Sequence, residues 1–142
     1  MNCDAELELQ IGLFDVALSF ASDAEREAEA LHSYAEGYSL RCYKYDRHVV
    51  AQSGFSLEDI MRYVYRSTRV VVVMNSPLYR KSSATRFEWK VLTGEFSGES
   101  IFVVDLGGAS LEALAHRLRY FSSLTDRAAM EIMRRAGRTR DG

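Results

Sequence analysis

Short apolar runs alternate with amphipathic segments along the chain. The runs have the length of strands and lie at residues 14–20, 39–43, 69–75 and 100–105, with a shorter one at 120–122. Strands that alternate with helices of ten or more residues predict right-handed βαβ crossovers, and therefore a parallel sheet with helices on both faces. The run from Arg69 to Asn75 is continuously apolar at its centre, which is typical of a central strand buried on both faces.

The segments between the runs carry helical signals. Ser22 with Glu25 has the spacing of a capping box, and Ser56 with Asp59 has the spacing of an N-terminal cap. Gly37 is a typical end for the helix that begins at Ser22. The helix after Ser56 carries a core-facing stripe of Leu57, Ile60, Met61, Val64 and Tyr65. Further helices are expected over residues 83–96, from Ser110, and from Thr125 or Asp126, the last with a stripe of Ala129, Ile132, Met133 and Ala136.

Three segments between these elements are expected to be loops that share one end of the sheet. They are residues 21–23, the polar stretch 44–54 closed by Gly54, and residues 76–83 after the central strand. In open parallel sheets, ligands bind outside the carboxyl ends of the strands, near the point where the strand order reverses. The sequence therefore predicts a cleft bordered by these three loops.

Length and composition indicate one ordinary globular domain. The 142 residues fit a single domain, with an N-terminal arm at residues 1–12 and a tail at 137–142. The formal net charge of −2 gives no general attraction to nucleic acid or to an anionic membrane. No apolar run approaches the roughly 18 residues of a membrane span, and the acidic N-terminus is unlike a signal peptide. We therefore expect a cytoplasmic protein with no direct nucleic-acid or membrane partner.

The sequence lacks the motifs of several common chemistries. Cys3, Cys42 and the three histidines are scattered, so neither a disulfide framework nor a metal site is expected, and a reducing compartment is indicated. The chain has no glycine-rich dinucleotide fingerprint, no phosphate-binding loop of nucleoside triphosphatases and no nucleophile elbow. A phosphoacceptor receiver domain needs an Asp at the end of the third strand, where this chain has Met74 and Asn75.

Two segments resemble Toll/interleukin-1 receptor (TIR) domains. The first, FDVALSFA from Phe14 to Ala21, is similar to the first box of that family, especially in its bacterial form. The second begins at Ser76 and ends at Glu88. In it, five residues fall in register with the family's pattern: Ser76, Tyr79, Lys81, Thr85 and Glu88. The resemblance extends from about residue 14 to residue 96, and weakly to Ala136.

This resemblance implies a fold, an activity and a mode of regulation. The fold is a flavodoxin-like three-layer sandwich, with about five parallel strands in the order 2-1-3-4-5. The activity is NAD+ glycohydrolysis, in which NAD+ is the substrate, no cofactor is needed and the product is linear or cyclised ADP-ribose. Bacterial members act in antiphage defence and are activated by self-association, here through residues 47–55 and the adjacent helices, under a sensor domain or partner protein. The alternative is a non-catalytic assembly module, and a third interpretation is a ligand-binding sensory domain.

Glu88 is the candidate catalytic residue, and its chemistry can be argued from the residue itself. Cleavage of a glycosidic bond to a cationic leaving group passes through an oxocarbenium-like state. A carboxylate beside the ribose can bind its hydroxyls and stabilise the developing positive charge. Nicotinamide leaves without protonation, so one carboxylate suffices. The competing interpretation is a capping box from Thr85 to Glu88, in which the glutamate only reaches back to the helix start.

Other candidate substrate-binding residues have structural alternatives. The candidates beyond those of the second segment are Ser19, Phe20, Ala21, Tyr43, Asp46 and Gly54. Phe20 can line a nicotinamide pocket or pack in the core, and Asp46 can accept from a ribose hydroxyl or cap its loop. Tyr79 can stack on the substrate or be an amphipathic loop residue, and Lys81 can meet the diphosphate or remain solvated. Gly54 is expected to close its loop with a positive φ.

One position departs from the family's pattern. Ala84 stands where the family has a Trp one helical turn before the Glu, so a stacking surface for the substrate is missing. Trp89 is the only Trp, and it is expected to pack beneath the helix or to lie in an interface.

Overall fold

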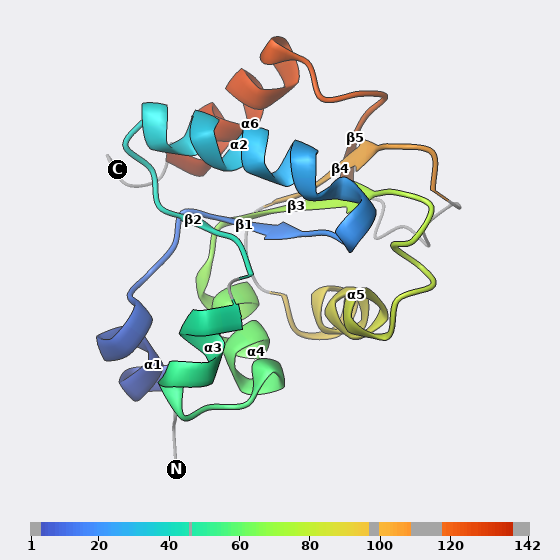
Figure 1. Cartoon of the computed structure of the whole chain (residues 1–142). Helices are drawn as coiled ribbons and strands as arrows, with labels where there is room; N and C mark the ends of the chain where they lie inside the picture. Colours follow the sequence, from blue (N-terminus) through green and yellow to red (C-terminus); the bar gives the residue numbers. More distant parts are fainter. Residues whose placement is uncertain (1–3, 46, 97–99, 109–117, 138–142) are drawn as a thin grey trace.

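A parallel β-sheet forms the centre of the molecule, and helices cover both of its faces (Figure 1). The computed structural model describes residues 4–45, 47–96, 100–108 and 118–137. The strands are β1 (Val16–Ser19), β2 (Cys42–Tyr43), β3 (Val70–Asn75), β4 (Ser100–Asp105) and β5 (Leu118–Phe121). The helices are α1 (Asp4–Ile11), α2 (Glu25–Gly37), α3 (Arg47–Ser53), α4 (Leu57–Ser67), α5 (Ser83–Glu95) and α6 (Asp126–Gly137), and a 3-10 turn, η1 (Ser22–Ala24), leads into α2.

The strands lie in the order β2-β1-β3-β4-β5, and every neighbouring pair is parallel. Strand β2 contributes only two residues at one edge, so the four strands β1, β3, β4 and β5 make up most of the sheet. The predicted α/β class with a parallel sheet is confirmed, and the arrangement is consistent with a flavodoxin-like fold. The first two strands are shorter than the apolar runs at 14–20 and 39–43 suggest, and β5 begins two residues earlier than expected.

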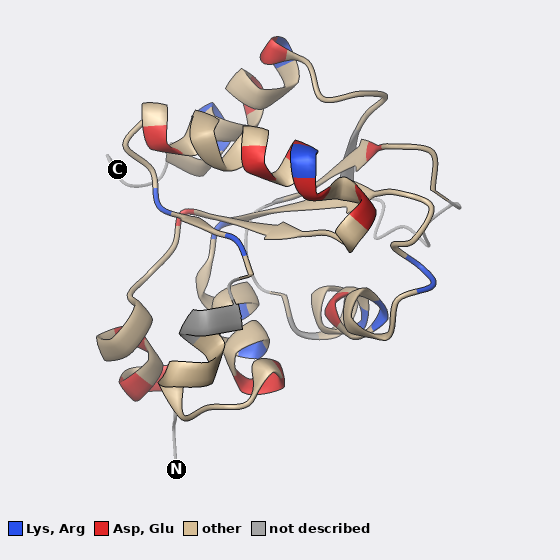
Figure 2. Ribbon diagram, in the orientation of Figure 1, with Lys and Arg blue, Asp and Glu red and all other residues tan. Residues whose placement is uncertain are grey.

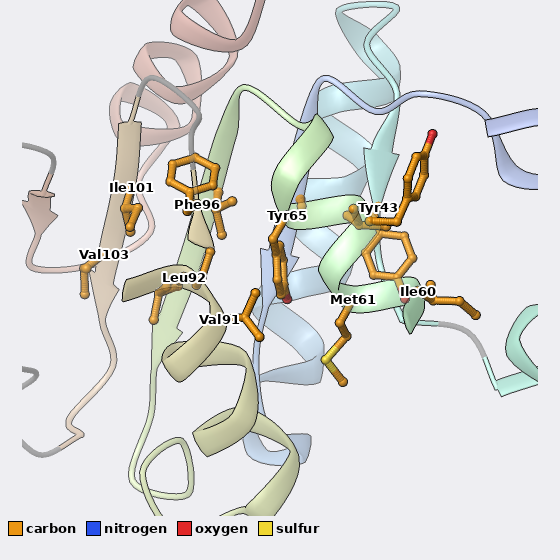
Figure 3. Close-up of a cluster of buried hydrophobic side chains, with 14 of the residues drawn as sticks. Tyr43, Ile60, Met61, Tyr65, Val91, Leu92, Phe96, Ile101 and Val103 are labelled. Carbon is orange, nitrogen blue, oxygen red and sulfur yellow. The ribbon is translucent and has the colours of Figure 1, made fainter. Parts of the chain in front are cut away.

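Strand β3 separates two apolar cores. All six of its residues are buried, as its continuous apolar run predicts. Val71 and Val73 belong to a core shared with α4 and α5, part of which is drawn in Figure 3. Val70, Val72 and Met74 belong to the opposite core, which α2 and α6 cover. In Figure 1, α2 and α6 accordingly lie on one side of the sheet, and α1, α3, α4 and α5 lie on the other.

Helix α4 forms as its sequence predicts. The Ser56 hydroxyl accepts a hydrogen bond from the Asp59 backbone N–H at 3.1 Å, which caps the first turn. The predicted stripe faces the core: Leu57 is partly buried, and the other four stripe residues are buried. Tyr63 is buried as well, and its hydroxyl donates to the Gly12 carbonyl oxygen at 2.7 Å.

The expected N-terminal arm is instead a helix. Residues 4–11 form α1, and its Leu7 is fully buried against the core that α4 covers. An ion pair between Asp4 and Arg66 (2.8 Å) joins the start of α1 to the last turn of α4. Leu7 and Ile11 are four residues apart on this helix and both pack against the core. This helix was not predicted from the sequence, because acidic residues dominate the segment and obscure that short apolar pair.

The polar stretch after β2 also differs from its expected loop. Residues 47–53 form α3, and Val50 packs against the core next to α4. Gly54 follows with φ of +80°, so its predicted backbone conformation is confirmed. The segment is therefore a short helix and a glycine turn, with a buried contact of its own.

The two ends of α2 are capped differently from the prediction. The 3-10 turn begins at Ser22 as expected, but Ala21 is its N-cap and no side chain caps either η1 or α2. The capping-box prediction for Ser22 and Glu25 is therefore wrong, since the intervening 3-10 turn moves the start of α2 to Glu25. Helix α2 does end at Gly37, yet the left-handed residue is Ser39, with φ of 59°.

Two of the other predicted helices lie in the described part of the chain, and the structure confirms both. Helix α5 matches the expected range to within one residue. Helix α6 begins after Thr125, whose hydroxyl accepts from the Ala128 N–H at 3.1 Å, and its four predicted stripe residues are buried. The expected helix from Ser110 and the tail after Gly137 lie outside the described residues.

The contrast between Ser56 and Ser22 gives a stability prediction. Ser56→Ala removes the side-chain cap of α4 and should lower the free energy of unfolding by about 1 kcal/mol. Ser22→Ala is the matched control, because the Ser22 side chain caps no helix. Urea unfolding followed by circular dichroism measures both. Equal losses in the two variants would contradict the assignment of Ser56 as the cap.

Candidate functional site

Ser19 and Tyr79 meet at the carboxyl end of the sheet. Ser19 is the last residue of β1 and is fully buried, and Tyr79 lies fully buried in the segment between β3 and α5. Their hydroxyl oxygens are 2.6 Å apart. Because the Ser19 hydroxyl donates to Glu88, the Tyr79 hydroxyl is the donor of this pair.

Glu88 receives two hydrogen bonds on the same oxygen. Its Oε1 accepts from the Ser19 hydroxyl at 2.7 Å and from the Tyr65 hydroxyl at 2.7 Å. Ser19 comes from β1, Tyr65 from α4 and Glu88 from the second turn of α5. These hydrogen bonds, with the one between Ser19 and Tyr79, link four segments at one buried point. Among the described residues, none donates a hydrogen bond to Glu88 Oε2.

The carboxyl group of Glu88 is buried, and no described residue supplies a cation to it. Figure 2 shows no charged residue along β1 or β3, so the strands beside the site carry no countercharge. Within the described part of the chain, no ion pair reaches Glu88, whose exposed fraction is only 9%. Burial raises the pKa of Glu88 to about 7, and the hydrogen bonds from Tyr65 and Ser19 oppose that rise. Glu88 can therefore exchange a proton near neutral pH.

The capping-box interpretation of Glu88 is wrong. Ser82 is the N-cap of α5, and no side chain caps that helix. The Thr85 hydroxyl instead donates to the Tyr79 carbonyl oxygen, with a longer contact to the Ser82 carbonyl oxygen at 3.3 Å. Thr85 thus fixes the backbone of Tyr79, while the Glu88 side chain extends to β1 and α4. The two residues have the spacing of a capping box but serve different contacts.

The segment that carries Tyr79 is also held from the loop after β1. The Asp23 carboxylate accepts from the Ser76 hydroxyl at 2.5 Å and from the Leu78 backbone N–H at 3.1 Å. Asp23 was not among the sequence candidates, although Asp in a loop that follows a strand is a common acceptor for backbone N–H groups. With the Thr85 and Ser19 contacts, these bonds fix the position of the segment that carries Tyr79.

The structure thus brings together Ser19, Tyr79, Thr85 and Glu88 of the sequence candidates. Tyr65 was missed as a site residue, because its place in the apolar stripe of α4 explained it as core. The available signal was its hydroxyl, since a buried Tyr in an otherwise aliphatic stripe needs a hydrogen-bond partner.

Other candidates lie elsewhere or serve packing. Phe20 follows Ser19 but packs in the opposite core, with the Lys44 ammonium 5.8 Å from the centre of its ring. This separation follows from the alternation of side chains along a strand. Ala21 is buried as the N-cap of η1. Tyr43 is buried, and its ring meets Phe14 edge-on at 5.3 Å between centroids.

The remaining candidates lie at the surface or outside the described residues. Lys81 and Ala84 are exposed near the start of α5, and Gly54 lies in the turn before α4. Asp46 lies outside the described residues. Trp89 is partly buried against the core beneath α5, which confirms its packing interpretation.

Comparison with known protein families and curated proteins assigns no function to this site, so its chemistry is argued from its geometry. No protein-family model matches the chain, and no curated protein is significantly similar to it in sequence. Among the described residues, no three His, Cys, Asp or Glu side chains cluster in a way that could bind a metal ion. None of the described helices combines the length and apolar character needed to cross a membrane.

Cys42 is an unsuitable nucleophile. It is a free cysteine in strand β2, and burial raises the pKa of its thiol to about 12. The thiol therefore stays protonated at neutral pH and lacks the thiolate that nucleophilic attack requires. Among the described groups with a shifted pKa, Glu88 is thus the one whose pKa is moved into the neutral range. It also lies in a hydrogen-bonded cluster.

The burial of Glu88 predicts a pH-dependent stability. Its pKa is higher in the folded chain than in the unfolded chain, so the folded state binds the proton more tightly between about pH 4.5 and 7. Stability from this group is therefore fully present at low pH and is lost as the pH rises toward 7. A rise of this size corresponds to about 3 kcal/mol.

Glu88→Gln should remove this loss while keeping the side-chain shape and an acceptor oxygen. The variant should unfold at a higher temperature than wild type at pH 8, and the difference should shrink at pH 5. Thermal unfolding followed by circular dichroism at both values is the measurement. Glu58→Gln, which changes an exposed carboxyl on α4, is the control and should show no such dependence. An equal difference at both pH values would argue against a raised pKa of Glu88.

Proposed function

We propose that this chain is a TIR domain that hydrolyses NAD+, with Glu88 as its catalytic carboxylate. The observation that supports this most directly is the position of Glu88, whose Oε1 is held by Ser19 at the carboxyl end of β1. In open parallel sheets this end of the central strands is where ligands bind. The first box and the segment from Ser76 to Glu88, which resemble TIR domains, are the two segments that meet here.

In the proposed reaction, the carboxylate acts on the ribose attached to nicotinamide. Oε1 is occupied by the Ser19 and Tyr65 hydroxyls, so Oε2 is the oxygen that accepts a hydrogen bond from a ribose hydroxyl. As the bond between nicotinamide and ribose breaks, positive charge develops on the sugar, and the nearby carboxylate stabilises it. Neutral nicotinamide leaves with the electron pair of the broken C–N bond. Water then attacks the sugar and releases a proton to give linear ADP-ribose, or a nucleophile of the substrate itself attacks to give a cyclic form.

The burial of Glu88 and Tyr79 fits an enzyme that must be activated. Tyr79 is fully buried, and its segment is tied down by Asp23, Thr85 and Ser19. We propose that NAD+ reaches Glu88 when this segment moves. We propose that self-association supplies that movement, through residues 47–55 and the adjacent helices.

The biological setting proposed for this enzyme follows from the same resemblance. It acts on cytoplasmic NAD+ in bacterial antiphage signalling, under the control of a sensor domain or partner protein. Depletion of NAD+ or production of a signalling nucleotide is the output.

A non-catalytic assembly module is the second candidate, and one observation favours it. Ala84 is exposed one helical turn before Glu88, where TIR hydrolases carry a Trp. Without that flat surface, the adenine or nicotinamide ring has one fewer stacking partner. In this alternative the Glu88 cluster only closes the end of the sheet, and function lies in contacts between copies.

NAD+ turnover separates the two candidates. Wild-type protein, at high concentration or crowded on beads, should consume NAD+ and release nicotinamide, measured by chromatography over time. Glu88→Gln should lower the rate by about 10²–10³-fold, because the charge that stabilises the transition state is lost. Glu36→Gln, which changes an exposed carboxyl on α2 across the sheet from residues 47–55, is the control and should retain wild-type activity. A Glu88→Gln protein as active as wild type would rule out the hydrolase, and inactivity of assembled wild-type protein would favour the assembly module.

A further inference from the structure

Tyr65 stands apart from the other residues of its helix face. It belongs to the apolar stripe of α4, and its neighbours Ile60, Met61 and Val64 contribute only hydrocarbon or thioether atoms. Its exposed fraction is 1%, so its hydroxyl has no access to bulk water. A buried hydroxyl without a partner is costly, and here the partner is Glu88 Oε1 at 2.7 Å. In Figure 3, Tyr65 extends from α4 beside Val91 and Leu92, which α5 contributes.

The two carboxyl oxygens of Glu88 differ in their hydrogen bonds, and packing of the side chain alone does not require this difference. Both donors, Ser19 and Tyr65, converge on Oε1, and among the described residues none donates to Oε2. Two donors from different elements, β1 and α4, fix the position of one oxygen and restrict rotation of the carboxyl group. The second oxygen is thereby held in a defined direction with its lone pairs unused by the described residues.

We propose that Tyr65 is a positioning residue, which fixes the Glu88 carboxylate through Oε1 so that Oε2 is presented to the ribose of the substrate. This role rests on the proposed hydrolase activity. Tyr65 touches neither the substrate nor the reacting bond, and it acts by orienting Glu88 and by stabilising its ionised form. Catalytic groups held in place by a second set of hydrogen bonds lose activity when those bonds are removed.

The electrostatic surroundings make Tyr65 a persistent donor. Burial, with further effects from Glu88, Tyr79 and Tyr43, raises the pKa of Tyr65 well above its ordinary value. Its hydroxyl therefore stays protonated throughout the neutral range. Tyr79 is held protonated in the same way, mainly by burial and by the charge of Glu88. Among the described residues, the titratable side chains hydrogen-bonded in this cluster are thus Glu88 and tyrosines that do not ionise near neutral pH.

The test compares Tyr65→Phe with Tyr63→Phe. Both variants remove one buried hydroxyl from α4 and keep the ring, but the Tyr63 hydroxyl donates to the Gly12 carbonyl oxygen instead of Glu88. The first measurement is the pKa of Glu88 in each protein, from the side-chain carboxyl carbon resonance of ¹³C-labelled glutamate, assigned with Glu88→Gln. A hydrogen bond to the ionised form favours ionisation, so Tyr65→Phe should raise this pKa by about one pH unit. Tyr63→Phe should leave it unchanged.

The second measurement is NAD+ hydrolysis by the assembled proteins as a function of pH. Tyr65→Phe should lower kcat between about tenfold and a hundredfold, because the carboxylate is no longer held in one orientation. The acid limb of its pH profile should move to higher pH, in step with the pKa of Glu88, and KM should change little. Tyr63→Phe should keep the wild-type profile, even if it lowers stability.

The two measurements separate the failure of the positioning role from the failure of the hydrolase. Active wild-type protein with an unchanged pKa of Glu88 in Tyr65→Phe overturns the positioning role alone. A wild-type protein that does not hydrolyse NAD+ when assembled overturns the hydrolase and, with it, the role of Tyr65 in catalysis.

If Tyr65→Phe does not fold, a second substitution with the opposite expected effect on the pKa of Glu88 tests the same role. Site-specific replacement of Tyr65 by 3-fluorotyrosine makes the phenol more acidic, and therefore a stronger donor, at nearly constant volume. The pKa of Glu88 should then fall below its wild-type value. An unchanged or higher value overturns the proposal.

Discussion

Burial of strand β3 on both faces is the constraint on which the rest of the structure depends. Its six residues contribute to an apolar core on each side, and each core must be covered by helices because apolar surface is unfavourable in water. The parallel neighbours β1 and β4 then place their carboxyl ends at the same end of the sheet. Ser19, which ends β1 there, is brought next to α5, so the location of the Glu88 cluster follows from the sheet.

Glu88 is the exception within this apolar framework. A leucine or glutamine at position 88 would avoid the penalty of placing an ionisable group 9% exposed and without a cation among the described residues. The chain instead places three hydroxyl groups around it, from Ser19, Tyr65 and Tyr79. A side chain that opposes stability and yet is surrounded by matched polar partners is typical of a functional site. This is the physical reason for assigning the chemistry to Glu88 rather than to the more exposed charged residues.

Sequence reasoning succeeded where local physics determines the outcome. The Val-rich run of β3, the Ser56 cap and the stripe of α4 each contain their own signal within one segment, and the structure confirms all three. It failed at α1 and α3, whose few apolar residues matter only because α4 and the sheet lie beside them. The candidate site also depends on contacts between distant segments. Thr85 and Glu88 have the spacing of a capping box, and only contacts across 69 and 23 residues, to Ser19 and Tyr65, show that Glu88 serves another purpose.

In the proposed hydrolase, substrate access and the ionisation of Glu88 are coupled. Burial is the main cause of the raised pKa of Glu88, and the Tyr79 hydroxyl is linked to the Glu88 carboxyl through Ser19. Hydrolysis of NAD+ requires both room for the substrate and an ionised carboxylate. In the proposed activation, displacement of the Tyr79 segment admits water and substrate together, and hydration favours the charged form of Glu88. In the proposed hydrolase, a single movement therefore meets both requirements, while the Tyr65 hydroxyl on α4 keeps the carboxylate oriented after Tyr79 has moved away.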